Sequence, residues 1–490
     1  MKQISFILFL EEKIKKINIL IIGGTIKEVF NDVCGYSLDK EQIKVCLCKK
    51  DSILVVAGAG SGKSLTMIGK IKYLVECKKI DPREILCITF TNAAAKSLED
   101  KINNYYNYGI KVYTFHKLSL EIIDKKINIA TDYLLTYIVD EYFYILGKDM
   151  KLKVKKILGL IDYPYNYILN SKELYNLKKI IITFINLFKT NNYDLNYFLK
   201  IKKDKDIIRI IIDIYLIYES ELRSTNSLDF NDMISLATKK VNKEGIRNIK
   251  YIIIDEYQDT SYVRYLLVKA IKDKTKAKLI CVGDDYQSIY RFTGCSLDMF
   301  LNFKKYFKHS KILKINNTYR NSQELIDIAG NFIQKNKKQI YKRLKSKKHI
   351  KKPIKIMYGN NLDKLISKVK EKNILILGRN NFDIDKYNYK KKENIRYMTI
   401  HKSKGLEEDT VIIINLKDDI LGIPNKIKDN KILNYINKYK ENYPYEEERR
   451  LFYVAMTRTK GNLYLLVDKN SSIFVNEIIS KYNKKIEYLT

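Results

Sequence analysis

The stretch Ala57-Gly58-Ala59-Gly60-Ser61-Gly62-Lys63-Ser64 has the composition and spacing of a phosphate-binding loop. It follows the apolar run 53–56 and precedes a helix-like pattern over 65–75, which is the context that such a loop requires. Glycines let backbone N–H groups curl around phosphate oxygens, and the helix N-terminus adds a favourable dipole. Lys63 is expected to reach the β- and γ-phosphates and Ser64 to coordinate Mg²⁺. A plain glycine-rich turn is the alternative, but the flanking strand and helix favour a nucleoside triphosphate site.

A second apolar run, 251–254, leads directly into Asp255-Glu256-Tyr257-Gln258-Asp259-Thr260. A P-loop enzyme needs an acid at the end of a second strand, and Asp255 can hold Mg²⁺ through its water ligands. Glu256 can accept a proton from the attacking water. Adjacent acids after a strand can also cap a helix, but beside a P-loop the catalytic interpretation is favoured. The two motifs predict a nucleotide hydrolase without indicating which one.

The elements that must position these residues are short apolar runs that alternate with helical patterns. Further runs occur at 85–88, 279–282, 354–356, 374–377, 411–414 and 463–467. Runs of this length between helices indicate buried parallel strands, so the predicted fold class is α/β. They form two series, before and after about residue 305, and a Lys/Tyr/Ile-rich helical block at about 120–225 interrupts the first. Lys-dense stretches at 342–352 and 386–392 are expected to be solvated loops, with phosphate contact as the alternative.

The charge balance points to a polyanionic partner. The chain has 91 Lys and Arg against 56 Asp and Glu, a net charge of +35. Such an excess repels itself unless a polyanion shares it, which favours a nucleic-acid partner. A codon bias toward Lys, Ile, Asn and Tyr is the alternative. The hydrophobic fraction of 46% excludes a disordered tail protein and a small disulfide scaffold.

The cysteines and the N-terminus bear on the compartment. Seven scattered Cys and four His show no zinc-ligand spacing, so no structural metal is expected. Unpaired Cys87 and Cys281, on expected strands, fit a reducing cytosol. The apolar run 4–10 meets Glu11 and Glu12 too soon for a signal peptide, and no run reaches the length of a membrane span. We predict a cytoplasmic protein with no membrane partner.

The sequence DEYQDT at 255–260 resembles motif II of superfamily 1 helicases of the UvrD/Rep/PcrA type. The other motifs of that family have counterparts in the same order over about residues 36–467. They are YSLDKEQ at 36–42 (Q motif), TFTNAAA at 89–95 (Ia), TFH at 114–116 (Ib), GDDYQSIYRF at 283–292 (III), TYR at 318–320 (IV), MTIHKSKGLE at 398–407 (V) and EERRLFYVAMTRTK at 447–460 (VI). Single motifs could arise by chance, but this many in order could not.

The resemblance implies roles around ATP. Gln42 would hydrogen-bond the adenine, Tyr319 would stack on it, and Glu407 would contact the ribose. The loop residues 57–64 would hold the phosphates, with Ser64 and Asp255 holding Mg²⁺.

The resemblance also implies how the γ-phosphate is sensed. Gln287 would sense the γ-phosphate and couple its presence to DNA binding. Arg320 and Arg458 would be arginine fingers from the second motor domain, where they would neutralise the charge that develops in phosphoryl transfer. Hydrolysis and domain closure would then be one event.

Single-strand binding needs planar groups for base stacking and cations or amides for phosphates. In the family, several of the motifs line the DNA groove. The resemblance therefore implies DNA contacts at Phe90, Asn92, His116, Tyr290, Arg291, Phe292, Thr399, His401 and Lys402. For the aromatic residues a place in the core is the alternative, and for the histidines a structural role.

The resemblance implies two RecA-like motor domains. Domain 1A would comprise 1–119 and 226–306, the helical insertion 1B would comprise 120–225, and domain 2A would comprise 307–490. In the family a long 2B insertion separates the counterpart of Gly378-Arg379-Asn380 from motif V. Here only residues 381–397 lie between them, too few for a domain. We expect 2B to be absent or minimal near 380–397, with a protein partner in its place as one possibility.

These features predict an ATP-dependent DNA helicase or translocase that uses ATP and Mg²⁺. By resemblance it would move 3′ to 5′ on single-stranded DNA and at single-strand/duplex junctions. The alternative is an ATP-switched module that binds DNA or a partner without unwinding. An unrelated P-loop enzyme, such as a small-molecule kinase, is a third interpretation, which no sequence feature supports.

Overall fold

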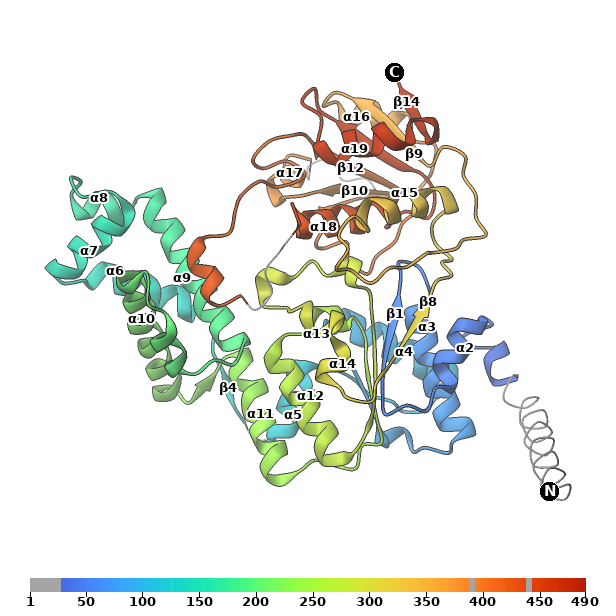
Figure 1. Cartoon of the computed structure of the whole chain (residues 1–490), viewed down its shortest axis with the longest axis horizontal. Coiled ribbons are helices and arrows are strands. Elements are labelled where there is room, and N and C mark those ends of the chain that lie inside the picture. The colour runs from blue at the N-terminus through green and yellow to red at the C-terminus, as the bar shows by residue number, and fades with distance from the viewer. Residues whose placement is uncertain (1–27, 125, 388–392, 438–442) are drawn as a thin grey trace, which may run out of the picture.

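The computed structural model describes residues 28–124, 126–387, 393–437 and 443–490. Residues 1–27, which include the apolar run 4–10, lie outside these ranges, as do residues 388–392 of the lysine-dense stretch 386–392. In Figure 1 two sheet-containing lobes lie one above the other, and a helical insertion extends from the lower one. Within the described ranges, no helix combines the length and apolarity needed to cross a bilayer.

The first lobe is built on a six-stranded parallel sheet with the order β3-β2-β6-β7-β1-β8. Its strands are β1 (Ser52–Ala57), β2 (Ile85–Thr89), β3 (Val112–Thr114), β6 (Tyr251–Ile254), β7 (Lys278–Gly283) and β8 (Lys311–Ile315). Alternate residues of β1 face opposite layers. Ile53 and Val55 pack with α2 (Lys40–Leu47), α3 (Lys63–Lys72) and α4 (Asn92–Tyr106). Leu54 and Val56 pack toward α5 (Phe115–Ile123), α11 (Phe230–Glu244) and α12 (Tyr262–Thr275). The central strands are buried on both faces, so they read as continuous apolar runs.

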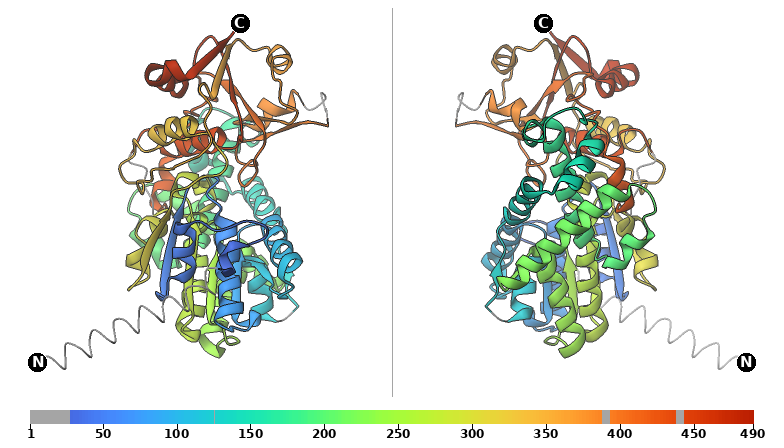
Figure 2. Two further views of the ribbon diagram at one scale, coloured as in Figure 1. Left: turned by 90° about the vertical axis from the view of Figure 1, so that its right-hand side faces the viewer. Right: turned by 90° about the vertical axis from the view of Figure 1, so that its left-hand side faces the viewer.

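The second lobe repeats this plan with the strand order β11-β10-β12-β13-β9-β14, again all parallel. Its strands are β9 (Ile354–Tyr358), β10 (Ile374–Gly378), β11 (Ile395–Thr399), β12 (Thr410–Leu416), β13 (Leu463–Val467) and β14 (Ile486–Leu489). One face packs on α15 (Gln323–Ile333), α18 (Glu446–Met456) and α19 (Ile473–Tyr482). The other packs on α16 (Leu362–Ser367) and α17 (Asn381–Asp385). Side views show this lobe stacked on the first, with the C-terminus at its far end (Figure 2). The α/β class and the two parallel-sheet domains are confirmed.

The expected change of domain at residue 306 is wrong. Strand β8, residues 311–315, pairs with β1 in the first sheet, with Val55 opposite Leu313. The chain therefore leaves the first lobe only after this strand. The sequence Lys-Ile-Leu-Lys-Ile contains two exposed lysines, Lys311 and Lys314, because β8 is an edge strand, so a search for continuous apolar runs does not detect it.

The helical insertion lies between β4 (Asn128–Ile129) and β5 (Ser227–Leu228), which pair in parallel at its base. It contains α6 (Leu134–Ile145), α7 (Lys148–Leu158), α8 (Tyr165–Leu169), α9 (Lys172–Thr190) and α10 (Lys205–Ser224). These helices bury a core of their own, centred on residues such as Phe184 and Ile211. The Ser171 side chain caps the long α9 by accepting a hydrogen bond from the backbone N–H of Leu174. The helical block expected at 120–225 corresponds to this insertion, although its limits as a domain stay a prediction.

A segment of the second lobe reaches across to the insertion. We call residues 418–437, which follow β12, the strap; its short helix η7 (Lys431–Tyr435) lies beside α9 (Figure 1). Ile432 and Ile436 are buried in the core of the insertion. The Asn191 side chain donates a hydrogen bond to the Ile436 carbonyl at 3.1 Å. The insertion therefore contacts both lobes, although the sequence places it wholly within the first.

Candidate active site

The predicted P-loop connects the end of β1 at Ala57 to the start of α3 at Lys63. Gly60 and Gly62 have φ angles of +69° and +74°, a region that favours glycine. A Cβ at Gly60 would lie 2.5 Å from the Arg320 Cβ, and one at Gly62 would lie 2.7 Å from the Gln42 Nε2. These two positions therefore require glycine, because a side chain there would collide with the residues predicted to bind the adenine and the γ-phosphate.

The residues of this loop fit a triphosphate. The Ser61 hydroxyl is buried and has no hydrogen-bond partner within the described part of the chain. Gly62 caps α3 without a side chain, so the first N–H groups of that helix face the loop. These donors suit phosphate oxygens at a helix N-terminus. With Lys63, Ser64 and Asp255 beside them, the set can hold a triphosphate and its Mg²⁺.

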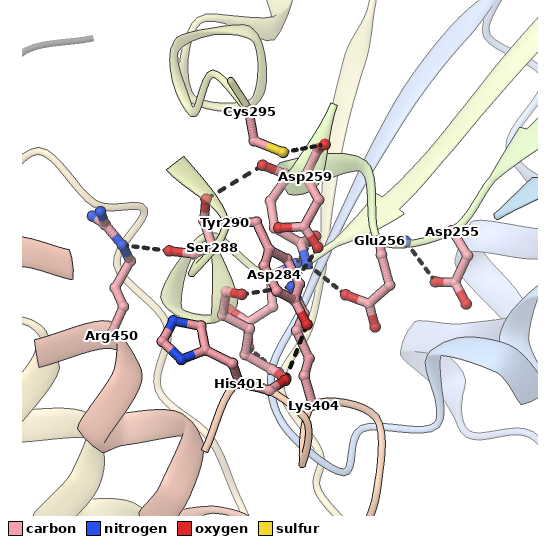
Figure 3. Close-up of polar contacts among 12 residues, drawn as sticks. Asp255, Glu256, Asp259, Asp284, Ser288, Tyr290, Cys295, His401, Lys404 and Arg450 are labelled. Carbon is pink, nitrogen blue, oxygen red and sulfur yellow. Dashed lines mark hydrogen bonds and ion pairs between the residues drawn. The ribbon is translucent and has the colours of Figure 1, made fainter. Parts of the chain in front are cut away.

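The two acids after β6 lie next to the loop. The Lys63 Nζ is 3.3 Å from the Glu256 Oε1, and the Gln258 amide donates to the Glu256 Oε2 at 2.5 Å. Burial and the adjacent Glu256 charge raise the pKa of Asp255. For Glu256, burial acts in the same direction, but Lys63 and Lys404 outweigh it and hold the pKa below its usual range. Figure 3 shows the two carboxylates side by side at the end of the strand. Glu256 is thus ionised and next to the lysine of the loop.

Gln287 and Arg458 meet across the two lobes. The Arg458 Nη2 donates to the Gln287 Oε1 at 3.0 Å, and the Gln287 Nε2 donates to the Asp284 Oδ2 at 2.7 Å. Arg458 follows α18 of the second lobe and is 1% exposed. Burial and the nearby Arg320 lower its pKa, but a guanidinium stays charged at neutral pH. A buried cation from one lobe therefore binds the expected γ-phosphate sensor of the other.

Arg320 comes from the connection between the lobes. It lies after β8, which ends at Ile315, and before α15, which begins at Gln323, so its expected role as an arginine finger of the second motor domain stays a prediction. Its Nε donates to the Glu407 Oε2 at 2.7 Å and its Nη1 to the Thr457 carbonyl at 3.2 Å. Arg320 lies beside the phosphate loop, since a Cβ at Gly60 would lie 2.5 Å from the Arg320 Cβ.

The expected adenine residues lie at the N-terminus of α2. Asp39 caps this helix, and its Oδ2 accepts a hydrogen bond from the Tyr319 hydroxyl at 2.8 Å. The Tyr319 ring is 63% exposed, so its face is available for stacking. Gln42 is 1% exposed, and its Nε2 donates to the Ser61 carbonyl at 3.2 Å. Asp39, which contacts both Tyr319 and Gln42, was not predicted as a site residue. Its helix-capping pattern, Asp-x-x-Gln, can nevertheless be recognised in the sequence.

The predicted DNA residues form two aromatic groups. In one, the Phe292 ring lies 5.7 Å from the His401 ring, and the Tyr290 hydroxyl donates to the His401 carbonyl at 3.0 Å. In the other, the Phe90 ring packs 5.2 Å from the Arg264 guanidinium. Phe292 is 59% exposed, as a base-stacking ring must be.

The polar members of the predicted DNA set lie near these groups. His116 packs against the Phe230 ring at 4.6 Å, and burial followed by the charge of Arg264 lowers its pKa to about 4. Burial, Arg379 and Lys404 likewise lower the pKa of His401 to about 4. Both imidazoles are therefore neutral at pH 7. The exposed Asn92 begins α4, and the Lys402 backbone N–H donates to the Thr399 hydroxyl at 3.4 Å.

The predicted DNA residue Arg291 forms ion pairs with two acids of the protein itself. Its Nη1 lies 2.7 Å from the Asp429 carboxylate of the strap, and its Nε lies 3.0 Å from the Glu447 carboxylate. A DNA phosphate would have to compete with both acids. These partners could not be predicted from the sequence, because both lie more than a hundred residues away from Arg291 along the chain.

Three buried cations near Gln287 were missed as functional residues. Lys404 forms an ion pair with Asp259 and donates to the Gln287 carbonyl at 2.7 Å. Arg450 donates to the Ser288 carbonyl at 2.7 Å (Figure 3). Lys404 and Arg450 fall within motifs V and VI, so their motif positions were an available signal.

The third missed cation is Lys342, and its burial corrects the expectation that residues 342–352 form a solvated loop. Lys342 is fully buried against Asp284 and Asp285, so this stretch is not uniformly a solvated loop. Its exposed neighbours at 343, 345, 347 and 348 fit the prediction. Charge density along a sequence cannot identify which lysine meets a buried acid.

Comparisons with known proteins agree with this geometry. A family model described as the UvrD/REP helicase N-terminal domain matches residues 38–308, and one described as the UvrD-like helicase C-terminal domain matches 380–470. DNA helicase IV of Escherichia coli K12 is 27% identical, covering 91% of this chain and 71% of the relative. The Rep helicase of Buchnera aphidicola subsp. Acyrthosiphon pisum is 30% identical, covering 76% and 61%. A probable DNA helicase II homolog of Rickettsia felis is 31% identical, covering 66% and 48%. The chain thus spans about half to seven-tenths of the length of these relatives.

Proposed function

Because the chain belongs to the UvrD/Rep helicase family, we propose that it is an ATP-dependent DNA helicase that translocates along single-stranded DNA from 3′ to 5′. The observation that carries the proposal is the hydrogen bond between Arg458 of the second lobe and Gln287 of the first. A γ-phosphate contact at this point would be shared by both lobes. Hydrolysis would then change how the lobes hold each other, which is the requirement for a motor.

The chemistry is phosphoryl transfer from ATP to water. Lys63 and the N–H groups of the loop bind the phosphates, while Ser64 and Asp255 would hold Mg²⁺, which neutralises charge on the phosphate oxygens when bound. Glu256, ionised beside Lys63, accepts the proton of the attacking water. Arg320 and Arg458 stabilise the charge that develops on the γ-phosphate.

The same residues connect the nucleotide to DNA. Lys404 of motif V holds both Asp259 and the Gln287 carbonyl, and its ammonium lies 5.0 Å from the Tyr290 ring. Tyr290 in turn contacts His401, next to the exposed Phe292. Movement of Gln287 on hydrolysis would therefore reach the ring on which a base stacks.

The substrate we propose is single-stranded DNA and its junctions with duplex. Stacking on Phe292 needs an unpaired base. The net charge of +35 suits a phosphate backbone. Neutral His401 and His116 would contribute hydrogen bonds rather than charge to that backbone.

The domain assignment that we propose is 1A up to the end of β8, 1B as the helical insertion, and 2A beyond. Between Asp385 of α17 and Ile395 of β11 there is no room for a long 2B domain. We therefore propose robust single-strand translocation and weaker duplex unwinding, with a protein partner able to supply the missing contacts. A cytoplasmic location stays a prediction.

The test is ATP hydrolysis with and without single-stranded DNA. We expect DNA to stimulate turnover, and Lys63→Ala or Glu256→Gln to abolish it. Lys50→Ala and Glu141→Gln, which change exposed residues, serve as matched controls. Displacement of streptavidin from labelled 3′ and 5′ ends reports the direction of movement. ATP-dependent binding without displacement would instead support the switch interpretation, and turnover that DNA leaves unchanged would refute the motor.

A further inference from the structure

Lys342 lies in the connection between α15 and β9, outside every motif on which the proposed function rests. Its side chain is fully buried, as are those of Asp284 and Asp285, with which it forms ion pairs. Its ammonium also lies 3.5 Å from the centroid of the Tyr286 ring. Moving three charged groups out of water is costly, and their mutual attraction offsets this cost only when they are held in close, hydrogen-bonded geometry. The position of this cluster is therefore informative.

The cluster lies directly behind the γ-phosphate sensor. The Asp284 Oδ1 receives the Lys342 ammonium, while its Oδ2 accepts the Gln287 amide N–H at 2.7 Å. An amide has one donor end and one acceptor end. With its Nε2 fixed on Asp284, Gln287 presents its Oε1 to Arg458 at 3.0 Å. Lys342 thus fixes the carboxylate that decides which way the amide points.

The residues that follow Lys342 contact the phosphate loop and the connection between the lobes. The Leu344 side chain fills the space beside Gly58 of the P-loop, where a Cβ would lie 2.5 Å from its Cδ2. The Lys345 carbonyl accepts a hydrogen bond from the Thr318 N–H at 2.8 Å, and the Lys345 N–H donates to the Asn316 carbonyl at 2.8 Å. One short segment therefore contacts the phosphate loop, motif III and the connection that carries Arg320.

We propose that Lys342 is a positioning residue for γ-phosphate sensing: through Asp284 it holds the Gln287 amide in the orientation that links the P-loop lobe to Arg458. This role rests on the proposed ATP-dependent function and deepens it. Lys342 touches no reacting atom in this arrangement. Its loss should impair discrimination of the γ-phosphate more than binding of the adenine or of the other phosphates, because the residues for those contacts lie elsewhere.

The test compares Lys342→Met with Lys347→Met, an exposed lysine on the same segment. The first readout is the ratio of the affinities for a non-hydrolysable ATP analogue and for ADP, measured with fluorescent nucleotides. We expect this preference for the triphosphate to fall about tenfold in Lys342→Met, the scale of one lost charged hydrogen bond. The second is DNA-stimulated turnover, where we expect kcat to fall about 10- to 100-fold with little change in KM. Lys347→Met should leave both unchanged.

A second variant separates positioning from folding. Lys342→Met alone leaves two buried carboxylates without a cation and can fail to fold. Lys342→Met with Asp285→Asn removes one charge of each sign, so the cluster keeps its charge balance. We expect this double variant to melt near the wild-type temperature while the triphosphate preference stays low, because Asp284 still lacks its ammonium.

Recovery of the triphosphate preference in the double variant, or its failure to fold, would overturn the proposal, since Lys342 would then act through stability alone. An unchanged preference in folded Lys342→Met would do the same. The affinity ratio does not depend on hydrolysis. A wild-type chain without DNA-stimulated turnover would therefore refute the proposed motor, and that result is distinct from any result on Lys342.

Discussion

Arg458→Lys should separate the charge of this residue from its geometry. In the structure the guanidinium uses three donors at once: Nε to the Val454 carbonyl at 2.9 Å, Nη1 to the Leu406 carbonyl at 3.2 Å and Nη2 to the Gln287 Oε1 at 3.0 Å. A lysine ammonium carries its donors at a single point and cannot span these positions. The variant keeps a positive charge but loses the planar set of N–H donors that fixes the position of that charge.

The expected cost follows from the loss of one preorganised donor at the transition state. Such a loss lowers kcat by about 100- to 1,000-fold, or about 3–4 kcal/mol. KM for ATP should change little, because Tyr319, Gln42 and the P-loop are untouched. The assay is steady-state ATP hydrolysis at saturating single-stranded DNA, with a thermal melt to confirm folding.

The matched control is Arg396→Lys on β11, where the arginine is half exposed and pairs with Glu408. A surface pair of this kind contributes little to stability, so the control should behave as wild type. If Arg458→Lys stays within about threefold of the wild-type kcat, or if only KM changes, the arginine-finger reasoning is refuted.

Three further predictions test the DNA site, the strap and the buried histidines. Phe292→Ala should weaken single-stranded DNA binding by about 1–3 kcal/mol in a fluorescence titration, and affinity equal to wild type would show that no base stacks there. Ile436→Ala should destabilise the contact of the strap with the insertion by about 2–5 kcal/mol, seen as faster amide exchange over 418–437; exchange that stays slow would mean that the strap is held elsewhere. Burial lowers the pKa values of His116 and His401 to about 4 from 6.5, so the unfolded chain binds protons first as the pH falls. The free energy of unfolding should therefore decrease between about pH 6.5 and pH 4, and urea midpoints should lose this slope in a double His→Gln variant.

The central strands of both sheets could be predicted from the sequence, and the edge strands could not. All eight apolar runs are strands: β1, β2, β6 and β7 in the first sheet, and β9, β10, β12 and β13 in the second. The four strands missed in these two six-stranded sheets, β3, β8, β11 and β14, are the two edges of each sheet. A central strand is covered on both faces and is apolar throughout, whereas an edge strand is short or alternates with polar residues.

The candidate site divides in a similar way. Lys63 and Glu256 could be predicted from spacing, because a phosphate loop and a strand-end acid require local geometry, whereas Gln287 was predicted from the resemblance of its motif to the family. The partners of Arg291 and Lys342 could not, because Asp429 and Asp284 lie far from them along the chain. The pairing of a charged side chain depends on which segments the fold brings together.

The sequence by itself determined that this chain has two parallel α/β lobes, a helical insertion, a P-loop with its acids, and the ordered motifs of one helicase family. Each of these depends on residues close together in sequence, where covalent geometry and burial on both faces leave a readable pattern. Only the tertiary structure decided that β8 belongs to the first sheet, that the strap ties the insertion to the second lobe, and that Lys342 lies behind Gln287. Those outcomes depend on packing between segments that are distant in sequence. The identity of a single residue does not predict which of these segments it will contact.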